Sequence, residues 1–532
     1  MSNFLFVKGQ VITMEREGLI YPACAVKEDR ICGVGEPDFL RGLLGEEYEE
    51  VDLKGGVLLP GFVDCHFHVV MGCFFKMNLD LMGMGVSSID ELLNLFRERV
   101  SEAQPGKWIQ GLRLNELDLQ EKRYPSLAEL DEVAPDNPVL IMRYDGHSGL
   151  ANSRALELAG VDQDTPDPPG GEICKVDGKL TGLLKEKAMT IILNVVPMPE
   201  AEELLKGRDL LRETLLSQGI TGYHNIMLTS EDGPSGALGP YEIPLFKMFE
   251  DGLPFRNYPL INANTVSDTI GVLEKEFNAK KVDGVWQGGV MKLFADGTFG
   301  SRTAQLFEDY SDSAGEKGYM VGEIGQLRKT IFEAHREGLR IAVHTIGDRA
   351  VDQIARIFLD AEQQIGQKQL RHRIEHCSMV QPETVEVLKN AGVICSMQPS
   401  FIVSEGSWIR DRVGKRVKFV YPMKTLLDQA IPMCGGSDAP VEVPEPLVGI
   451  GGSVTRDGFT DDQALTPYEA LALYTSQAAY ASCQEQSQGT ITPGKKADLV
   501  VLDQNPTEIS PQEIKNIKVR LTMIDGKVEY QV

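Results

Sequence analysis

The sequence of 532 residues predicts an α/β fold, a (β/α)8 TIM-like barrel with a composite β-sandwich domain from both chain ends and a large α+β insertion after barrel strand 1. Two observations predict the barrel: short apolar runs recur along the chain, and stretches of helical periodicity follow them. The insertion is predicted because residues 70–198 interrupt this alternation after the first apolar run.

The predicted barrel strands are short apolar runs bounded by Gly, Pro and polar residues. They lie at 57–68, 220–226, 255–263, 290–297, 340–347, 372–377, 392–400 and 431–440. Helical stretches follow several of them, at 200–219, 326–338, 348–366 and 466–479. A parallel barrel closes with eight strands, each followed by a helix, so we expect the barrel to span residues 59–484.

The insertion at 70–198 combines both kinds of pattern. Helices are predicted at 87–103 and 148–160, strands at 107–113 and 138–144, and a hairpin at 170–184. The insertion leaves the barrel at the carboxyl end of a strand, where barrel enzymes place their active sites. We therefore expect it to lie over the active-site mouth and to help select the substrate.

Both chain ends carry the alternation of Val, Ile and Leu with Gly turns that is typical of strands. These strand patterns lie at 3–14, 23–34, 47–58, 489–503 and 517–531. Neither end has enough strands for a stable sandwich by itself. Residues 1–58 and 485–532 are therefore predicted to pair into one composite β-sandwich domain that flanks the barrel.

Composition restricts the possible partners. The formal charge of -25 and the absence of a long Lys/Arg run exclude nucleic acid as an expected partner and favour a small-molecule substrate, neutral or cationic. No stretch of about 18 apolar residues predicts a membrane span, and the first residues lack the pattern of a secretory signal. Nine scattered cysteines are typical of a reducing cytoplasm, so a cytoplasmic location is expected.

Potential metal ligands lie at the ends of five predicted strands. His66 and His68 are two residues apart on strand one, so both imidazoles project from the same face of an extended chain. The remaining candidates lie on strands four, five, six and eight, and they are Lys292, His344, His376 and Asp438. Side chains at the carboxyl ends of barrel strands can converge on the barrel axis. The sequence therefore predicts a metal centre built from these six residues.

Seven segments extend this pattern over nearly the whole chain. They are LLPGFVDCHFH, MRYDGHSGLANSRALELAG, VMKLFADGTFGSRTA, AVHTIGDRA, RIEHC, GGSDAPV and GTITPGKKADLVVLD. In these segments the sequence resembles the amidohydrolase superfamily and, within it, the YtcJ-like or amidohydrolase 3 group, which includes N-substituted formamide deformylases. The resemblance implies a metal-dependent hydrolase that cleaves a carbon–nitrogen bond other than a peptide bond, such as the amide of an N-substituted formamide.

The resemblance also implies roles for the six residues. His66, His68 and Asp438 would bind the first of two Zn²⁺ ions, and His344 and His376 would bind the second. Lys292 would be carboxylated by carbon dioxide and bridge the two ions. Imidazole and oxygen ligands suit zinc best, although manganese, iron or cobalt would also bind. Hydroxide generated at the ions would attack the substrate, while Asp438 acts as the catalytic acid and base.

Residues in two loops are candidates for substrate contacts. Tyr144, Asp145 and His147 follow a predicted strand of the insertion, and the resemblance places this segment near the site. A capping role for His147 is the alternative. Asp296 and Arg302 follow Lys292 in a glycine-rich loop, where turn geometry alone is the alternative explanation.

One further histidine, His335, lies within a predicted helix and is expected at the surface. Two other functions remain open. The first is a deaminase of the same superfamily with a single metal ion, for which a bridging Lys292 has no use. The second is a scaffold protein on this fold that has lost its catalysis, although all six ligand positions are filled here. The superfamily resemblance also suggests a homo-oligomer.

Overall fold

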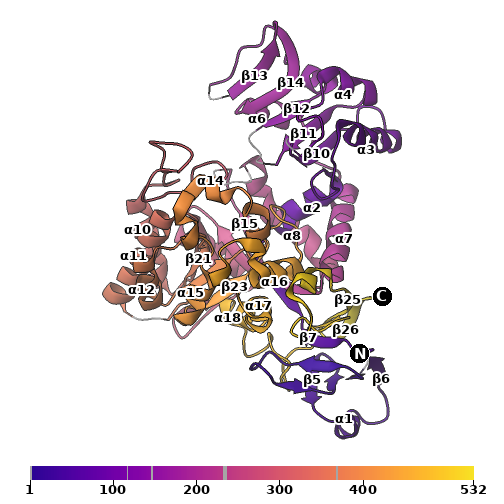
Figure 1. Ribbon diagram of the computed structural model, residues 1–532, viewed down its shortest axis with the longest axis vertical. Coiled ribbons are helices and arrows are strands. Elements are labelled where there is room, and N and C mark those ends of the chain that lie inside the picture. Colours follow the sequence, from indigo (N-terminus) through magenta and orange to yellow (C-terminus); the bar gives the residue numbers. More distant parts are fainter. Residues whose placement is uncertain (1–2, 117, 145–147, 170, 232–235, 367–368) are drawn as a thin grey trace. The chain divides into compact units, whose positions relative to one another are not determined.

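The computed structural model describes residues 3–116, 118–144, 148–169, 171–231, 236–366 and 369–532 (Figure 1). The chain divides into two compact units. One comprises Met1–Val70 with Arg212–Val532, and the other comprises Met71–Leu211. Within the described ranges, no helix is both long enough and apolar enough to cross a membrane.

The first unit contains a sheet of eight parallel strands. Neighbouring strands in this sheet are also successive barrel strands along the chain. In this order they are β8 (Phe62–Phe67), β15 (Ile220–Leu228), β16 (Arg256–Asn262), β19 (Val290–Phe294), β20 (Ile341–Thr345), β21 (Arg373–His376), β22 (Ile394–Met397) and β23 (Met433–Gly435). They coincide with the eight predicted runs, so the predicted fold class is confirmed.

The first and last strands meet at their carboxyl ends. Phe67 and Ala439 form a parallel bridge just beyond β23. The backbone N–H of His68 donates to the carbonyl of Ala439 at 2.9 Å, and the N–H of Asp438 donates to the carbonyl of His66 at 2.8 Å. The seam of the barrel therefore runs between two groups of predicted metal ligands.

The barrel interior is filled by side chains at alternate strand positions, as the pleat of a strand requires. A layer of apolar side chains forms one cluster of buried residues, namely Ile226, Leu228, Tyr258, Leu260, Val290 and Ala342. Lys292 follows Val290 by two residues, and His344 follows Ala342 by two. Both polar side chains therefore project from the interior face one step nearer the carboxyl end of the barrel.

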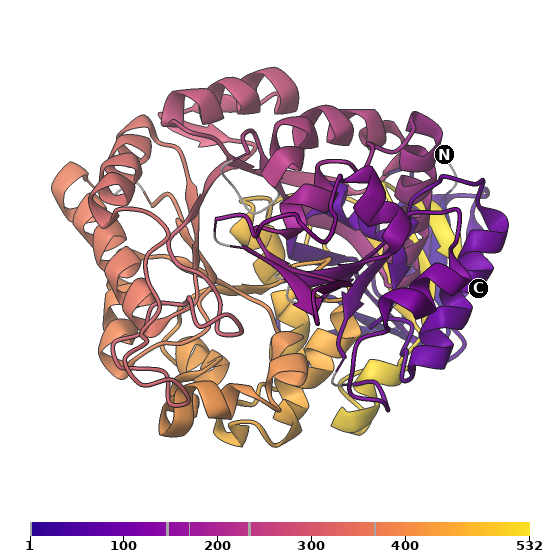
Figure 2. The same cartoon turned by 90° about the horizontal axis from the view of Figure 1, so that it is seen from above.

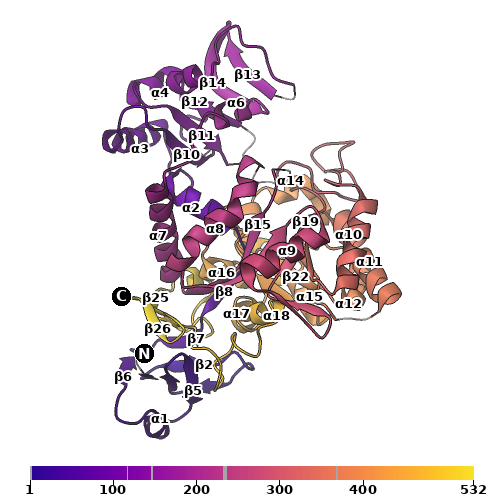
Figure 3. The same cartoon turned by 180° about the vertical axis from the view of Figure 1, so that it is seen from behind.

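Helices cover the outside of the sheet. Figure 1 shows α10 (Ile324–Glu337), α11 (Asp348–Ile365) and α12 (Pro382–Ala391) side by side along its edge. Viewed from behind, α8 (Glu242–Phe249) and α9 (Val266–Phe277) cover another stretch of strands (Figure 3). Figure 2 shows the helices arranged around the strands. Each has an apolar face, and in α11 this face includes Val351, Ile354 and Phe358, whose helical spacing brings them to one side.

Strands from both chain ends build two sheets that share one core. The first sheet has the order β5 (Arg30–Val34), β4 (Cys24–Lys27), β1 (Phe4–Val7) and β6 (Glu49–Asp52). The second has the order β26 (Lys527–Gln531), β25 (Val519–Ile524), β24 (Leu499–Leu502), β7 (Val57–Pro60), β2 (Gln10–Ile12) and β3 (Ile20–Tyr21). Side chains from both sheets, among them Phe6, Val26, Leu499 and Met523, form one buried cluster. Neither chain end buries these side chains alone.

The second unit holds a six-stranded sheet flanked by helices. Its strand order is β13 (Gly171–Val176), β14 (Lys179–Glu186), β12 (Ser148–Ala151), β11 (Val139–Arg143), β10 (Ile109–Leu114) and β9 (Leu79–Asp80). The helices are α3 (Ile89–Glu102), α4 (Leu127–Val133), α5 (Ser153–Leu158) and α6 (Met189–Leu193).

One boundary in this unit differs from the prediction. The sequence predicts a helix over 148–160, but Ser148–Ala151 form a strand that pairs with β11 and β14. The helix starts only after Asn152, whose side chain accepts a hydrogen bond from the N–H of Ala155 and caps it. Pairing on both edges buries all four strand residues, which outweighs their helical pattern.

Candidate metal centre

Three of the predicted ligands converge at the barrel seam. Nε2 of His66 and Nε2 of His68 each lie 3.3 Å from Oδ1 of Asp438. One ligand atom from each residue lies within 4.8 Å of the others. His66 and Asp438 are buried, and His68 is half-buried. This arrangement of two imidazoles and one carboxylate can hold a metal ion.

His344 and His376 extend this group along the carboxyl ends of the strands. The ring centroids of His344 and His376 are 4.3 Å apart, and those of His376 and His66 are 4.7 Å apart. Nε2 of His344 donates to the carbonyl of Gly297 at 3.3 Å, so its Nδ1 keeps the lone pair. Four predicted histidine ligands therefore lie in one cluster.

Backbone geometry explains how neighbouring residues reach this cluster. His376 has a φ of 69° and Asp438 has a φ of 60°, both in the left-handed region that non-glycine residues seldom occupy. Successive residues of a regular strand face opposite sides of the sheet. The left-handed conformation at His376 breaks this alternation at the end of β21, so Glu375 and His376 both face the cluster. Such backbone conformations gather at functional sites, where surrounding structure holds them in place.

Lys292 is buried in the barrel next to these histidines. Within the described part of the chain, its Nζ has no hydrogen-bond partner. Burial lowers the pKa of Lys292 to about 8, against the opposing effect of the Glu375 and Asp438 carboxylates. An amine with this pKa is partly neutral near pH 7, and a neutral amine can react with carbon dioxide. Nδ1 of His376 is likewise buried and unpaired among the described residues.

The donor set fits a metal centre. Two buried nitrogen atoms without partners, on Lys292 and His376, would each cost free energy unless a ligand satisfied them. Burial lowers the pKa of His344 to about 3 and holds the pKa of His66 and His376 far below the ordinary value. The imidazoles are therefore neutral near pH 7, which is the form that coordinates metal ions.

A buried carboxylate that the sequence does not single out, Glu375, supports the cluster. Nδ1 of His66 lies 2.5 Å from Oε2 of Glu375. Although burial alone would raise the pKa of Glu375, the charges of Arg373 and Lys292 hold that pKa below its usual value. The ionised carboxylate only accepts, so His66 carries its proton on Nδ1 and directs the Nε2 lone pair at the candidate metal position.

Arg373 in turn fixes Glu375. Its guanidinium donates to both oxygens of Glu375, to the carbonyl of Cys65 and to Oγ of Ser396, and it lies 2.7 Å from Nδ1 of His224. Arg373 and Glu375 are completely buried. The segment RIEHC could have indicated this pair. Two opposite charges within a fully buried strand must pair with each other or with other groups, such as those of a functional site.

The model of the amidohydrolase family matches residues 49–530, which is most of the chain. The chain belongs to the amidohydrolase family. The predicted family and the predicted enzyme class, a hydrolase of carbon–nitrogen bonds, are thereby confirmed.

Three similar proteins share nearly the full length of this amidohydrolase. YtcJ of Bacillus subtilis (strain 168) is 33% identical over 98% of both chains. N-substituted formamide deformylase of Arthrobacter pascens is 27% identical over 100% of this chain and 99% of its own. The crystal structure of a metal-dependent hydrolase from Pyrococcus furiosus is 28% identical, with a TM-score of 0.74 over 95% of this chain and 100% of its own.

Replacing Glu375 with glutamine is expected to weaken metal binding, measured with Zn²⁺ as the probe, about 10- to 100-fold. The neutral amide keeps the size of the side chain but gives His66 a weaker acceptor, so the imidazole becomes a poorer ligand. Zinc affinity measured by competition with a chelator would check this. Glu485→Gln, which removes a carboxylate that pairs with Arg371 at 2.8 Å near the other end of the barrel strands, is the matched control. Equal affinities for the wild type and Glu375→Gln would contradict the expectation.

The predicted substrate residues occupy different places. Asp296 is buried, and its carboxylate accepts hydrogen bonds from the backbone N–H groups of Gln305, Ile346 and Gly347. It therefore holds the loop after β19 to the loop after β20. Arg302 forms a bidentate pair with Asp312 at 2.8 and 3.2 Å. These contacts explain both residues as loop supports of the amidohydrolase.

The remaining substrate candidates belong to the second unit. Tyr144 is about half exposed, and the guanidinium of Arg143 lies 4.5 Å from its ring centroid. Arg143 also pairs with Glu116 at 2.9 Å. Asp145 and His147 lie outside the described residues.

A second histidine cluster lies under the outer helices of the barrel. His335, expected at the surface, is completely buried, because α10 packs this face against the sheet. The N–H of Ile341 donates to Nδ1 of His372, whose Nε2 then donates to Nδ1 of His335 at 3.0 Å. Nε2 of His335 donates to the carbonyl of Gly366. These bonds use all four ring nitrogens, so the pair is structural although Glu362 lies close enough to complete a metal-like group.

The stability of the amidohydrolase is expected to fall at acidic pH partly through His372. Burial lowers the pKa of His372 to about 3, so the unfolded chain takes up a proton near its ordinary pKa of about 6.5 and the folded chain does not. Its contribution is complete above pH 6.5 and is lost as the pH falls towards 3, by about 1.4 kcal/mol per pH unit. Denaturant unfolding from pH 4 to 7 should show a shallower dependence for His372→Gln. Parallel curves for the variant and the wild type would refute this role.

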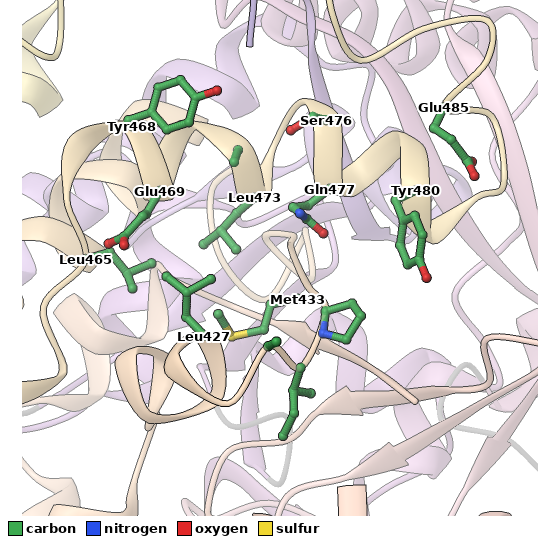
Figure 4. Close-up of a pocket in the computed structure, with 14 residues that line it drawn as sticks. Leu427, Met433, Leu465, Tyr468, Glu469, Leu473, Ser476, Gln477, Tyr480 and Glu485 are labelled. Carbon is green, nitrogen blue, oxygen red and sulfur yellow. The ribbon is translucent and has the colours of Figure 1, made fainter. Parts of the chain in front are cut away.

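A cavity of about 580 Å³ lies at the opposite end of strand β23 from Asp438 (Figure 4). Ile431, Pro432 and Met433 at the start of β23 line it, together with residues of α17 (Pro467–Leu473) and α18 (Ser476–Ala481). Its two carboxylates are already paired, Glu469 with Lys424 at 3.0 Å and Glu485 with Arg371. Because it lies at the opposite end of β23, the cavity is separate from the candidate metal centre.

Proposed function

We propose that this amidohydrolase uses two zinc ions to cleave an amide carbon–nitrogen bond outside the peptide class. His66, His68 and Asp438 would hold one ion. His344 and His376 would hold the other, and carboxylated Lys292 would bridge them. One observation carries the proposal: the amine of Lys292 is buried beside these ligands and has no hydrogen-bond partner in the described part of the chain.

Carboxylation of Lys292 is chemically balanced. Its neutral amine attacks the carbon of carbon dioxide, a nitrogen–carbon bond forms, and one proton leaves for solvent. The product is an anion, which suits a site that already gathers four imidazoles and one carboxylate. The lowered pKa of Lys292 supplies the neutral amine that this reaction needs.

The side chains divide the remaining work. The bound ions would supply an activated water molecule and polarise the substrate carbonyl. Oδ1 of Asp438 lies 3.3 Å from Nε2 of both His66 and His68, so this carboxylate would be close enough to the bound ion to take the proton of the activated water. Asp438 then delivers the proton to the leaving nitrogen. Glu375 keeps His66 in one tautomer during this exchange.

We further propose that the substrate is an N-substituted formamide. Support comes from the full-length similarity to the enzyme of Arthrobacter pascens whose name states this activity. Proteins that are 27% identical share a fold more reliably than a substrate, so the substrate class is decided by activity assays.

An activity screen tests both levels of the proposal. The zinc-loaded enzyme is assayed against N-substituted formamides, N-acyl amino acids, cyclic amides and esters, with released amine or acid as the readout. Release of amine from formamides is the expected result. Turnover of another amide class alone would overturn the formamide assignment, whereas no turnover of any amide would overturn amide hydrolysis itself.

A further inference from the structure

The end of strand β22 carries an amide side chain that the roles above do not use. Gln398 directly follows β22 and is completely buried. Within the described residues, both Nε2 and Oε1 of this side chain lack a hydrogen-bond partner. A buried amide with an unpaired donor and an unpaired acceptor is uncommon in folded proteins, and it calls for a ligand or water.

The strand order places Gln398 between two groups of metal ligands. β22 pairs on one side with β21, which ends in His376, and on the other with β23, which leads to Asp438. The N–H of Gly436 also donates to the carbonyl of Met397 at 2.9 Å. Gln398 therefore leaves the sheet at the point where its two neighbours deliver their ligands.

Alternation along β22 gives the direction of the side chain. Oγ of Ser396 accepts a hydrogen bond from Arg373 inside the barrel at 3.0 Å. Gln398 is two residues further towards the carboxyl end, so its side chain leaves the chain on the same interior face. Ser396 pairs with Glu375 in the strand register. Gln398 therefore lies two residues closer to the carboxyl end of the barrel than this pair, next to the level of His376.

The turn after Gln398 borders the metal centre. The ring of Phe401 stacks on the ring of His376 with centroids 6.4 Å apart and an interplanar angle of 16°. The N–H of Phe401 donates to the carbonyl of Gln398, which closes this turn. Ser400, within the same turn, has a buried hydroxyl that is also unpaired among the described residues. Unused polar groups thus line the side of the site formed by residues 398–401.

We propose that Gln398 binds the amide of the substrate, with Oε1 accepting the substrate N–H and Nε2 donating to a substrate oxygen. This inference rests on the proposed amide hydrolysis and narrows its substrate class. The substrate is a secondary amide, whose nitrogen carries a hydrogen, rather than a tertiary amide or an ester. A site built to pair with an N–H rejects analogues that lack it, because its own acceptor then stays unpaired.

Three matched probes test the contact: N-benzylformamide, its N-methyl derivative and benzyl formate. Only the first has an N–H. Gln398→Met keeps the length of the side chain but removes both polar atoms, and it is expected to lower kcat/KM for N-benzylformamide about 10- to 100-fold. The other two probes should lose less, because they lose only the contact from Nε2 to the substrate oxygen. Gln353→Met, which removes a partly buried amide on the outer helix α11, is the control and should leave all three values unchanged.

Binding gives a second readout that does not depend on turnover. In an Asp438→Asn background, calorimetry measures the Kd of N-benzylformamide and of its N-methyl derivative with and without Gln398→Met. Loss of the preference for the N–H probe in the double variant is expected. An equal effect on all probes, or no effect on any, would overturn the contact with Gln398. Failure of the wild type to cleave any formamide would instead count against the proposed function, because the binding comparison still reports on Gln398.

Discussion

Lys292→Ala is expected to lower bound zinc from about two ions per chain to about one and to reduce kcat/KM on the order of 10⁴-fold. Alanine cannot form the anionic bridge, so the site of His344 and His376 keeps only neutral ligands. The remaining ion would have to activate water and polarise the carbonyl alone. Metal analysis of the purified variant, together with amide hydrolysis assays, measures both effects.

A volume-matched variant separates chemistry from packing in this experiment. Lys292→Met fills the same buried space without an amine, so it should lose zinc and activity as Lys292→Ala does. A wild-type protein with about one metal ion per chain, and the same content after either substitution, would contradict the bridging role. That result would favour the deaminase with a single metal ion.

Asp438→Asn is expected to reduce kcat by about 10²- to 10⁴-fold, because the amide cannot take a proton from water or return one to the leaving nitrogen. The side chain keeps its shape and one oxygen, so most of the zinc should remain bound. Steady-state kinetics and metal analysis of the same preparation measure the two effects.

Asp64→Asn offers a matched control for this substitution. Asp64 is also buried at the barrel seam, but its Oδ1 accepts the backbone N–H groups of His66 and Ser437 and so serves the fold. Its replacement should change stability more than kcat. Equal losses of kcat in both variants would show that the loss of any carboxylate from the seam has this effect. That result would contradict the proton-transfer role of Asp438.

The barrel could be predicted because its strands repeat a local pattern. Each of the eight apolar runs sits between turn residues, and a helical stretch follows most of them, so periodicity alone locates the strands. The spacing of His66 and His68 also fixes their common face. Contacts between distant residues carry no such local signal. The pairing of Ser148–Ala151 with two strands, for example, depends on β14 (Lys179–Glu186), which is too far along the sequence for a local pattern to reveal the contact.

Candidate ligands could be proposed from the sequence, but the residues that support them could not. His344, His376 and Asp438 were found because they end strands, whereas Glu375 and Arg373 face inward from within one and resemble ordinary charged residues. For Asp296 and Arg302 the loop position leaves two explanations open. Their loop position suggested substrate contacts, but the structure gives them backbone and ion-pair partners, which only three-dimensional contacts reveal.

A metal ion bound at the seam between β8 and β23 would couple metal binding to the integrity of the barrel. His66 lies in the first strand and His68 directly follows it, whereas Asp438 follows the last strand. Among the described residues, a short stretch of backbone hydrogen bonds near Phe67 and Ala439 joins these strands. A cation shared by the three side chains ties residues about 370 positions apart in sequence, so it opposes the chain entropy released when the seam opens. Loss of such a cation would therefore loosen the barrel at the proposed active site, so inactivation and partial unfolding would share one cause.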